Sequence, residues 1–262
     1  MRLPRLWEEM TSAALAEAET AGLVAVLPIA AVEQHGPHLP LGTDRIIADG
    51  FVARVIELMP DDLPAVFLPT VAVGRSGEHS SFPGTLAAGW DTFTRLLIEI
   101  GEAVNDAGID RMVIVNSHGG NVAAMDTAAL ELRIRRAMTV AATNWYRFGH
   151  PEGAYPEDEL KLGIHGGMLE TSIMLHLRPD LVATDRLADF PSAQSRFAGA
   201  FKRLRVHGPV QFGWLAEDLN PEGVTGNAAG AMAGKGARSI DHGARAFVEL
   251  LDDMARLDTI AG

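Results

Sequence analysis

Apolar runs and helically spaced apolar positions alternate along this chain. Continuous apolar runs bounded by turn residues are typical of strands that are buried on both faces. These runs predict strands over residues 23–29, 65–74, 111–117 and 138–145. Apolar residues at helical spacing predict helices over residues 44–59, 91–108, 122–137, 168–177 and 239–257. Because parallel strands need a crossover connection, this order predicts a parallel sheet with helices on both faces.

Two regions have a less regular pattern. Residues 146–166 are loop-like, and residues 185–239 are dense in Gly and Pro, without a recognisable domain linker. We therefore expect residues 1–262 to form a single α/β domain, a three-layer α/β/α sandwich with a mostly parallel central sheet. The helix over 91–108 is expected to begin with an Asp/Thr cap and to end at Gly108.

The first predicted strand ends in a polar segment, VEQHGPHLPLGTD, which contains Glu33, His35, His38 and Asp44. Ligands of open α/β sheets bind outside the carboxyl ends of the strands, and carboxylate and imidazole groups suit divalent cations. Glu33 and His35 lie two apart in an extended segment and so point the same way, while the two oxygens of Asp44 can bridge two ions. The alternative is a helix-capping Asp44, a surface Glu33 and a loop His35. These residues alone leave both interpretations open.

His118 follows another predicted strand, in VIVNSHGGN, and its position favours the metal site. The two glycines after it let backbone or substrate approach closely. The competing interpretation of SHGGN is a phosphate cradle at a helix N-terminus. That signal is weak because the sequence contains neither GxGxxG nor GxxxxGK[ST].

Three further segments carry candidate side chains. In GIHGGMLETSIML, the carboxylate of Glu170 is either the polar edge of an apolar helix or a group that reaches the site together with His165. In RSGEHSSFPGT, His79 either orients a ligand or substrate or has a structural role. Ser76 is not a nucleophile elbow, because GRSGE is not GxSxG, and HExxH is absent from the sequence. The remaining histidines have no partner pattern: His150, His176, His207 and His242.

Composition narrows the class of protein. Of the 262 residues 47% are hydrophobic and 21% charged, which is typical of a globular protein, and no apolar stretch approaches the roughly 20 residues needed to span a bilayer. The formal net charge of −12 argues against a nucleic-acid-binding surface. Cysteine is absent and the N-terminal segment lacks an apolar signal region. We therefore expect a cytoplasmic protein that binds neither nucleic acid nor membrane.

Taken together and in this order, VEQHGPHLPLGTD, GEHSSFPGTL, NSHGGN and HGGMLETSIML closely resemble the creatininase (creatinine amidohydrolase) family. The resemblance implies a creatininase-like three-layer α/β fold, paired divalent cations (zinc, manganese or iron) and amide hydrolysis. It also implies a homo-oligomer, since creatininase itself is a hexamer. The metal ligands that it implies are Glu33, His35, His118 and a bridging Asp44.

The sequence departs from creatininase itself in the HGGN segment. Gly120 stands where creatininase has a metal-site glutamate, and Gly119 stands where creatininase has an aromatic substrate contact. The chain therefore resembles the branch of the family that hydrolyses formamides and peptide bonds. Glu170 is then the candidate for the missing carboxylate, as a fifth ligand or as a general base.

The resulting functional prediction is an amidohydrolase that uses two divalent metal ions per chain and a metal-activated water. We expect it to cleave a cyclic or linear amide C–N bond in a lactam, a formamide or a small peptide-like substrate. Glu170 and His165 are the predicted catalytic groups, and the predicted substrate contacts are Ser76, His79, Gly119 and Gly120. The alternatives are a metal-binding protein without turnover, a peptidase-type member acting on a modified peptide, and a phosphate binder.

Overall fold

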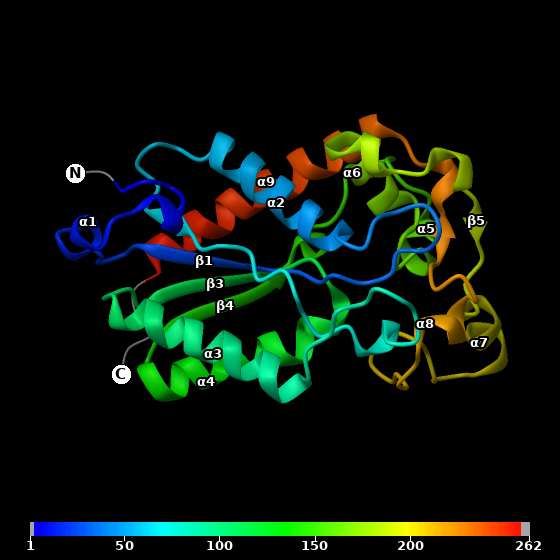
Figure 1. The fold of residues 1–262 in the computed structure, drawn as a ribbon, viewed down its shortest axis with the longest axis horizontal. Coiled ribbons are helices and arrows are strands. Elements are labelled where there is room, and N and C mark those ends of the chain that lie inside the picture. The colour runs from blue at the N-terminus through cyan, green and yellow to red at the C-terminus, as the bar shows by residue number, and fades with distance from the viewer. Residues whose placement is uncertain (1–2, 258–262) are drawn as a thin grey trace.

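The computed structural model describes residues 3–257 and has a parallel four-stranded sheet at its centre (Figure 1). The strand order is β2-β1-β3-β4. The strands are β1 (Val24–Ile29), β2 (Ala65–Phe67), β3 (Arg111–Asn116) and β4 (Thr139–Asn144). In the register, Val24 pairs with both Ala65 and Arg111, and Arg111 pairs with Thr139. All of β1 is buried, as expected for an apolar strand in the middle of a parallel sheet.

Helices cover both faces of this sheet. One layer contains α2 (Thr43–Leu58), α6 (Met168–Leu177) and α9 (Ala233–Arg256), and the other contains α3 (Trp90–Asp106) and α4 (Val122–Arg136) (Figure 1). Alternate residues of β1 face the two layers: Val24 and Val26 belong to the core with α2, α6 and α9, whereas Ala25 and Leu27 belong to the core with α3 and α4. This alternation follows from the period of two in a strand, and it confirms the predicted α/β/α layering.

A less regular region lies beyond the carboxyl ends of the strands, at the right of Figure 1. Its helices and strands are α5 (Glu157–Leu162), β5 (Asp189–Phe190), α7 (Gln194–Ala200), α8 (Ala216–Leu219) and β6 (Gly226–Asn227). The short helix α1 (Ser12–Ala16) lies near the amino end of β1. The 3-10 helices are Trp7–Glu9, Gly77–His79, Gly119–Asn121, Trp145–Phe148, Pro179–Leu181, Thr184–Arg186 and Ala228–Gly230.

Four predicted elements differ from the structure. The strand expected over 65–74 ends at Phe67, because Pro69 has no N–H for the ladder; the chain then continues beside β1 through irregular hydrogen bonds. The predicted Asp/Thr cap of α3 is wrong, since Gly89 is the N-cap and makes no side-chain hydrogen bond. Residues 146–166, expected to be a loop, contain α5.

The fourth difference is the start of α9, which lies six residues before the predicted position 239. The glycines in this segment suggested irregular chain. In the structure Gly236 lies directly against the backbone of Ser172 in α6, where a Cβ would overlap the Ser172 carbonyl group. Gly236 therefore allows close helix packing rather than ending the helix.

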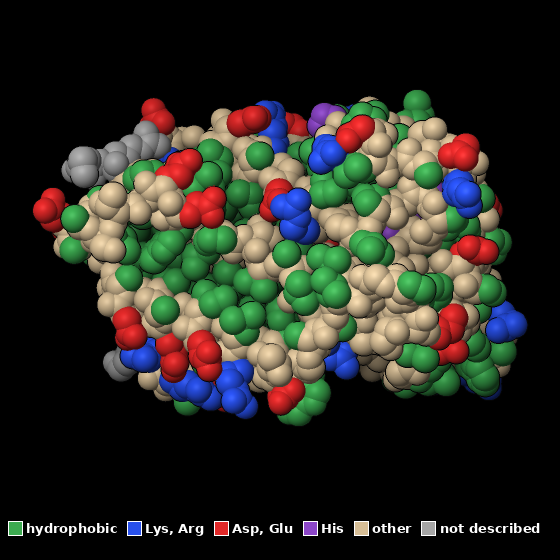
Figure 2. Space-filling view, viewed as in Figure 1, with side chains coloured by type: hydrophobic (Ala, Val, Ile, Leu, Met, Phe, Trp, Pro, Cys, Tyr) green, Lys and Arg blue, Asp and Glu red, His purple; other side chains and the backbone are tan. Residues whose placement is uncertain are grey.

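The surface seen in Figure 2 has hydrophobic side chains gathered over the strands, between the two helical layers. Lys and Arg side chains on this face are scattered among Asp and Glu. The described residues seen in this view therefore form no continuous basic surface of the kind that nucleic acid binds. Within residues 3–257, no helix is long and apolar enough to cross a membrane.

Candidate metal centre

Side chains from four parts of the chain converge at the carboxyl ends of β1 and β3. Glu33 and His35 lie on the loop after β1, and Asp44 lies in the first turn of α2. His118 follows β3, and Glu170 lies in the first turn of α6. These side chains are buried, with Glu33 0% and His35 and Asp44 1% exposed. The loops that sequence patterning placed at one edge of the sheet therefore meet there.

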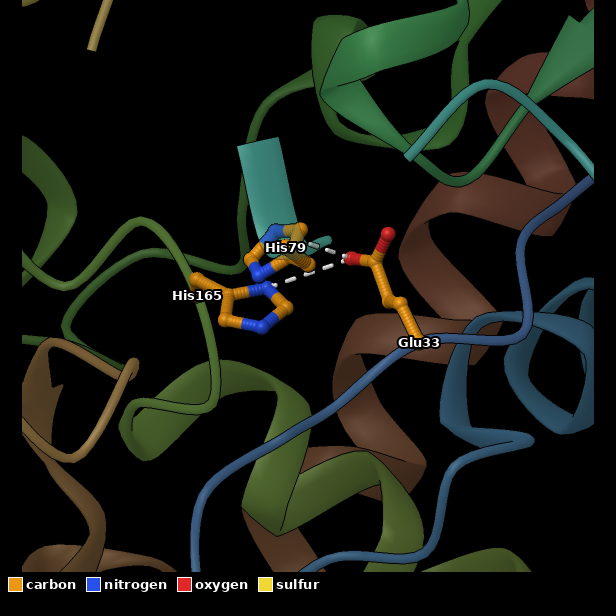
Figure 3. Close-up of side chains that lie close together, drawn as sticks. All are labelled: Glu33, His79 and His165. Atoms are coloured by element: carbon orange, nitrogen blue, oxygen red, sulfur yellow. Dashed lines mark ion pairs between the residues drawn. The ribbon is translucent and has the colours of Figure 1, made fainter. Parts of the chain in front are cut away.

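The carboxylate of Glu33 lies at the middle of the cluster. Its Oε1 atom is 3.1 Å from His118 Nδ1, 3.3 Å from His79 Nε2 and 3.6 Å from His165 Nδ1. Figure 3 shows the rings of His79 and His165 approaching this oxygen from separate segments. Neither Glu33 oxygen has a hydrogen-bond partner of acceptable geometry within the described chain.

Asp44 faces two histidines with its two oxygens. Oδ1 lies 3.6 Å from His35 Nε2, and Oδ2 lies 3.6 Å from His118 Nδ1. His35 Nε2 is also 3.9 Å from Oε2 of Glu170. Three overlapping groups place their donor atoms within 4.8 Å of one another: Glu33, His35 and Asp44; Glu33, His79 and His165; and His35, His165 and Glu170. Because the groups share members, the cluster has the donors for neighbouring cations.

Backbone carbonyl groups decide which ring nitrogen carries the proton in the neutral form of three histidines, because a carbonyl oxygen can only accept a hydrogen bond. Glu33 O, 3.1 Å from His35 Nδ1, leaves the lone pair of His35 on Nε2. Arg75 O, 3.1 Å from His118 Nε2, leaves the lone pair of His118 on Nδ1. Gln34 O, 2.8 Å from His165 Nε2, does the same for Nδ1 of His165. In these neutral tautomers, the lone pairs of His35 and His118 face carboxylate oxygens, an arrangement that a cation between them would satisfy.

His79 has the opposite tautomer. The amide of Gln34 is oriented by two backbone contacts, since its Oε1 accepts from Gly36 N (2.9 Å) and its Nε2 donates to Gly223 O (2.6 Å). The same Nε2 donates to His79 Nδ1 at 2.8 Å. His79 therefore carries its proton on Nε2, which lies 3.3 Å from Glu33 Oε1, and offers no lone pair on that side.

The electrostatic field of the cluster favours positive charge. Burial lowers the pKa of His35, but Asp44 and then Glu170 and Glu33 raise it to about 9. Burial raises the pKa of Glu33, yet the neighbouring histidines, His118 above all, bring it below its usual value. Burial also raises the pKa of Glu170 to about 7, with the charge of Asp44 adding to the effect and His35 opposing it. The carboxylates that stabilise charged imidazole also stabilise a bound cation.

A cavity of about 830 Å³ opens beside this cluster. His79, His118 and His165 line it on the side of the cluster, as do Gly119 and Gly120. On its other side it is lined by the segment around residues 207–215, including His207, Phe212 and Trp214. A smaller cavity of about 140 Å³ reaches the carboxylates of Asp44 and Glu170. The cluster is therefore accessible to a ligand of substantial size.

The other candidate residues lie in different surroundings. Ser76 is buried, its hydroxyl has no hydrogen-bond partner among residues 3–257, and it is not among the residues that line the large cavity. His38 lies outside the three donor groups and contacts Gly166 O (2.9 Å) and Thr171 Oγ1 (3.0 Å) through Nε2.

Three neighbours of the site escaped the sequence analysis. Gln34 orients His79, as described above. Glu78 Oε1 lies 3.4 Å from His118 Nε2, and the hydroxyl of Tyr146 lies 3.5 Å from Glu170 Oε1. Gln34 and Glu78 directly follow or precede candidate residues in sequence, which was the one available signal. Nothing in the local pattern indicated Tyr146.

The fold and the site define an α/β protein with a buried carboxylate–histidine centre at the carboxyl edge of its sheet. A family model described as creatinine amidohydrolase matches residues 8–251, so the chain belongs to the creatininase family. It is 36% identical over 215 residues to the mycofactocin precursor peptide peptidase of Mycolicibacterium smegmatis, covering 81% of this chain and 78% of that protein.

Solved structures agree with this assignment. A mutant creatininase of Zn-Zn type has a TM-score of 0.79 and 25% identity, covering 98% of this chain and 100% of that one. A creatininase described as the Mn form has a TM-score of 0.77 and 26% identity, covering 97% and 99%. These matches confirm the predicted family and the fold class. They also confirm that the chain belongs to a branch of the family other than creatininase itself. They also support a hydrolase of peptide-like or non-peptide C–N bonds.

Proposed function

We propose that the chain is a divalent-metal-dependent amidohydrolase whose centre is formed by Glu33, His35, Asp44 and His118. The observation that carries the proposal is a set of buried atoms that can ligate a metal and have no hydrogen-bond partner among the described residues. They are both oxygens of Glu33, Oδ2 of Asp44 and Nε2 of His35. Burying such atoms unpaired is costly. No described Lys or Arg forms an ion pair with Glu33 or Asp44, so a cation is the fitting partner.

We assign the ligand roles from the direction of each donor. Asp44 would contribute both oxygens to the proposed ions, because they face different histidines, and Glu170 would be the fifth ligand or a general base beside His35. Two ions per chain, of zinc, manganese or iron, suit this mixture of imidazole and carboxylate. A zinc form and a manganese form of the related creatininases support this range.

When bound, the metal supplies a Lewis acid and an activated water for attack on the amide carbonyl. His165 is placed to accept a proton at Nδ1, because its Nε2–H is held by the carbonyl group of Gln34. Glu170 Oε2 accepts a hydrogen bond of 2.6 Å from Gly166 N, which fixes its carboxylate toward His35. Either group can then deliver the proton to the leaving nitrogen.

The substrate that we propose is a linear, peptide-like amide. The cavity of about 830 Å³ extends from the cluster to Phe212 and Trp214, which leaves room for groups on both sides of the scissile bond. The relative from Mycolicibacterium smegmatis is named as a peptidase. In this proposal Gly119, Gly120 and His79 contact the substrate from the cavity wall. Ser76, expected from the sequence to contact the substrate as well, is buried and does not line the cavity. A lactam or a formamide remains the second substrate class.

Three broader predictions accompany this function. We retain a single domain over residues 1–262, a homo-oligomeric assembly, with a hexamer as the form suggested by resemblance, and a cytoplasmic location. A metal-binding protein without turnover is the alternative function. Hydrolysis of a formylated, lactam or short peptide substrate that is lost on chelation would rule out a metal-binding protein without turnover.

The experiment that tests the proposal is the metal content of the purified protein, measured by elemental mass spectrometry. We expect about two equivalents of a transition metal per chain. His35→Ala and Asp44→Ala should each lose metal and hydrolysis together, because each removes a donor from the shared cluster. His176→Ala, at the far end of α6 from the cluster, is the matched control and should keep both. Full metal content in both site variants would contradict the proposal, whereas a phosphate binder would be insensitive to chelation.

A further inference from the structure

The HGGN segment after β3 fixes a neighbouring loop through its asparagine. Asn121 Oδ1 accepts a hydrogen bond from Arg75 N (2.8 Å), and Asn121 Nδ2 donates to Ala30 O (2.9 Å). Asn121 is fully buried, so these contacts are not exchanged with solvent. The amide therefore holds the backbone at Arg75 against the end of β1.

This arrangement sets the surroundings of His118 Nε2. The carbonyl oxygen of Arg75 lies 3.1 Å from that nitrogen, and Glu78 Oε1 lies 3.4 Å from it. Both groups are acceptors, and together they surround the single proton on Nε2. The other ring nitrogen, Nδ1, faces Glu33 and Asp44.

The carboxylate of Glu78 occupies the space that a side chain at position 120 would need. A Cβ built on Gly120 overlaps Glu78 Oε1 and Arg75 O and lies 2.5 Å from His118 Nε2. At Gly119, by contrast, a Cβ would meet no atom within 4 Å. Of the two glycines, only Gly120 is sterically required. The three groups that require it are the Glu78 carboxylate, the Arg75 carbonyl oxygen and the His118 ring, which contact one another.

We propose that Glu78 is a positioning residue of the metal centre, which holds His118 with Nδ1 toward Glu33 and Asp44 and which reaches it only because position 120 is glycine. This inference rests on the metal-dependent function proposed above. A carboxylate that accepts the second N–H of a ligating imidazole fixes the ring orientation and increases the basicity of the ligating nitrogen.

The contact of Glu78 with Arg75 does not account for this placement. Arg75 Nη1 lies 3.7 Å from Glu78 Oε2, and the Arg75 side chain is 40% exposed. Exposed pairs of this length contribute little to stability. The oxygen that faces His118 is Oε1, and the Glu78 side chain is 16% exposed, so the histidine contact is the more enclosed of the two.

Glu78→Ala and Glu78→Gln test the assignment through metal affinity, measured by competition with a chromogenic chelator for zinc and for manganese. We expect the alanine variant to bind about 100-fold more weakly and the glutamine variant about 10-fold more weakly, the two ends of the usual range for such partners. Glu131→Gln, a half-exposed carboxylate on α4 paired with Arg135, is the control and should bind as the parent does. Parent-like affinity in both Glu78 variants would overturn the proposal. If the alanine variant fails to fold, the isosteric glutamine variant alone decides.

Nitrogen-15 NMR of the histidine side chains separates positioning from a general structural role. His118 should be in the Nε2–H form in the parent. In Glu78→Ala the Arg75 carbonyl group keeps that form, but the His118 signals should shift because Nε2–H has lost one of its two acceptors, while the His35 signals stay as in the parent. Weaker metal binding with unchanged His118 signals would overturn the proposal, because Glu78 would then act elsewhere. A parent protein that binds no metal would refute the proposed function. The effect of Glu78→Ala on the His118 signals would still test the role of Glu78 in that case.

Gly120→Ala tests the shared space. Alone, it should weaken metal binding, because the new methyl group displaces Glu78 or the His118 ring. Combined with Glu78→Ala it should cost less than the sum of the two single changes, since the clash with the carboxylate is removed and only those with Arg75 O and the His118 ring remain. Strictly additive losses would overturn the assignment of Gly120.

Discussion

Gln34 offers the centre no charge, yet its side chain joins three segments of the site. The amide contacts Gly36 on its own loop, Gly223 on the segment before β6 and His79 on the 3-10 helix Gly77–His79. Its side-chain contacts decide which nitrogen of His79 carries the proton, and its backbone carbonyl decides the same for His165. At the scale of single residues, a neutral neighbour therefore sets which ring nitrogen carries the proton in His79 and in His165.

The substitution Gln34→Glu changes this pattern with little change in volume. The new carboxylate would place an oxygen opposite Gly223 O and would leave His79 Nδ1 without its donor. Each buried group that loses its partner costs about 1–3 kcal/mol, so we expect the free energy of unfolding to fall by at least about 2 kcal/mol. Denaturant titration measures this change. Gln211→Glu, at an exposed position of the cavity rim, is the control and should stay within about 0.5 kcal/mol of the parent. Equal stabilities of the two variants would contradict the role of Gln34.

Three elements beyond the sheet are joined by one buried carboxylate, that of Glu159 in α5. Oε1 accepts from Met168 N at the start of α6 (2.6 Å), and Oε2 accepts from Asn227 N in β6 (2.8 Å). The Met168 amide belongs to the first turn of α6, where the helix dipole also favours negative charge. Glu159 thus fixes the start of α6, which carries Glu170, and the segment that carries His165.

Glu159→Ala should destabilise the protein and loosen the centre together. Two buried amides lose their acceptor, so we expect a loss of about 2–4 kcal/mol in unfolding free energy and weaker metal binding, although no ligand has been changed. Glu157→Ala on the same helix, in an exposed pair with Lys161, should cost no more than about 0.5 kcal/mol. Thermal unfolding and chelator competition on both variants give the comparison. Unaltered metal affinity in Glu159→Ala would show that the hydrogen bonds of Glu159 do not affect the geometry of the site.

The sequence predicts the elements that have a strong period and misses features that depend on distant contacts. The strands around β1, β3 and β4 are correct to within one or two residues, because an apolar run buried in a parallel sheet is visible locally. The convergence of Glu33, His35, Asp44 and His118 follows from strand ends sharing one edge. Glu159 and Gln34 could not be assigned, since each contacts partners far away in sequence.

At the scale of the whole molecule, the proposed ligands come from segments that lie far apart in the sequence. They extend from Glu33 after β1 to Glu170 in α6, and α6 packs against α2 and α9 in the same layer. A cation held by these residues binds the folded chain and has no equivalent site in the unfolded chain. Metal binding is therefore coupled to global stability.

Removal of metal should lower the melting temperature by a predictable amount. At a free metal concentration about 100 times the dissociation constant, each bound ion stabilises the native state by about 2.7 kcal/mol, so two ions contribute about 5 kcal/mol. In a chain of this size that corresponds to a shift of about 10–20 °C in the melting temperature. Calorimetry with and without chelator measures it, with Asp44→Ala as the control for weak binding to a surface of net charge −12. An equal shift in Asp44→Ala would place the stabilising ions outside the centre.

The close contact between Gly236 of α9 and Ser172 of α6 has a consequence for biosynthesis. The ribosome delivers Glu33, His35 and Asp44 early and Glu170 later, but α6 lacks one of the helices that it packs against until α9, at Ala233–Arg256, has been made. A nascent chain that already contains every proposed ligand is thus still unable to hold its cations firmly. On the proposed function, loading with metal would be a late event in the life of the chain, and a message truncated before α9 would yield a product with all the proposed ligands and no finished centre.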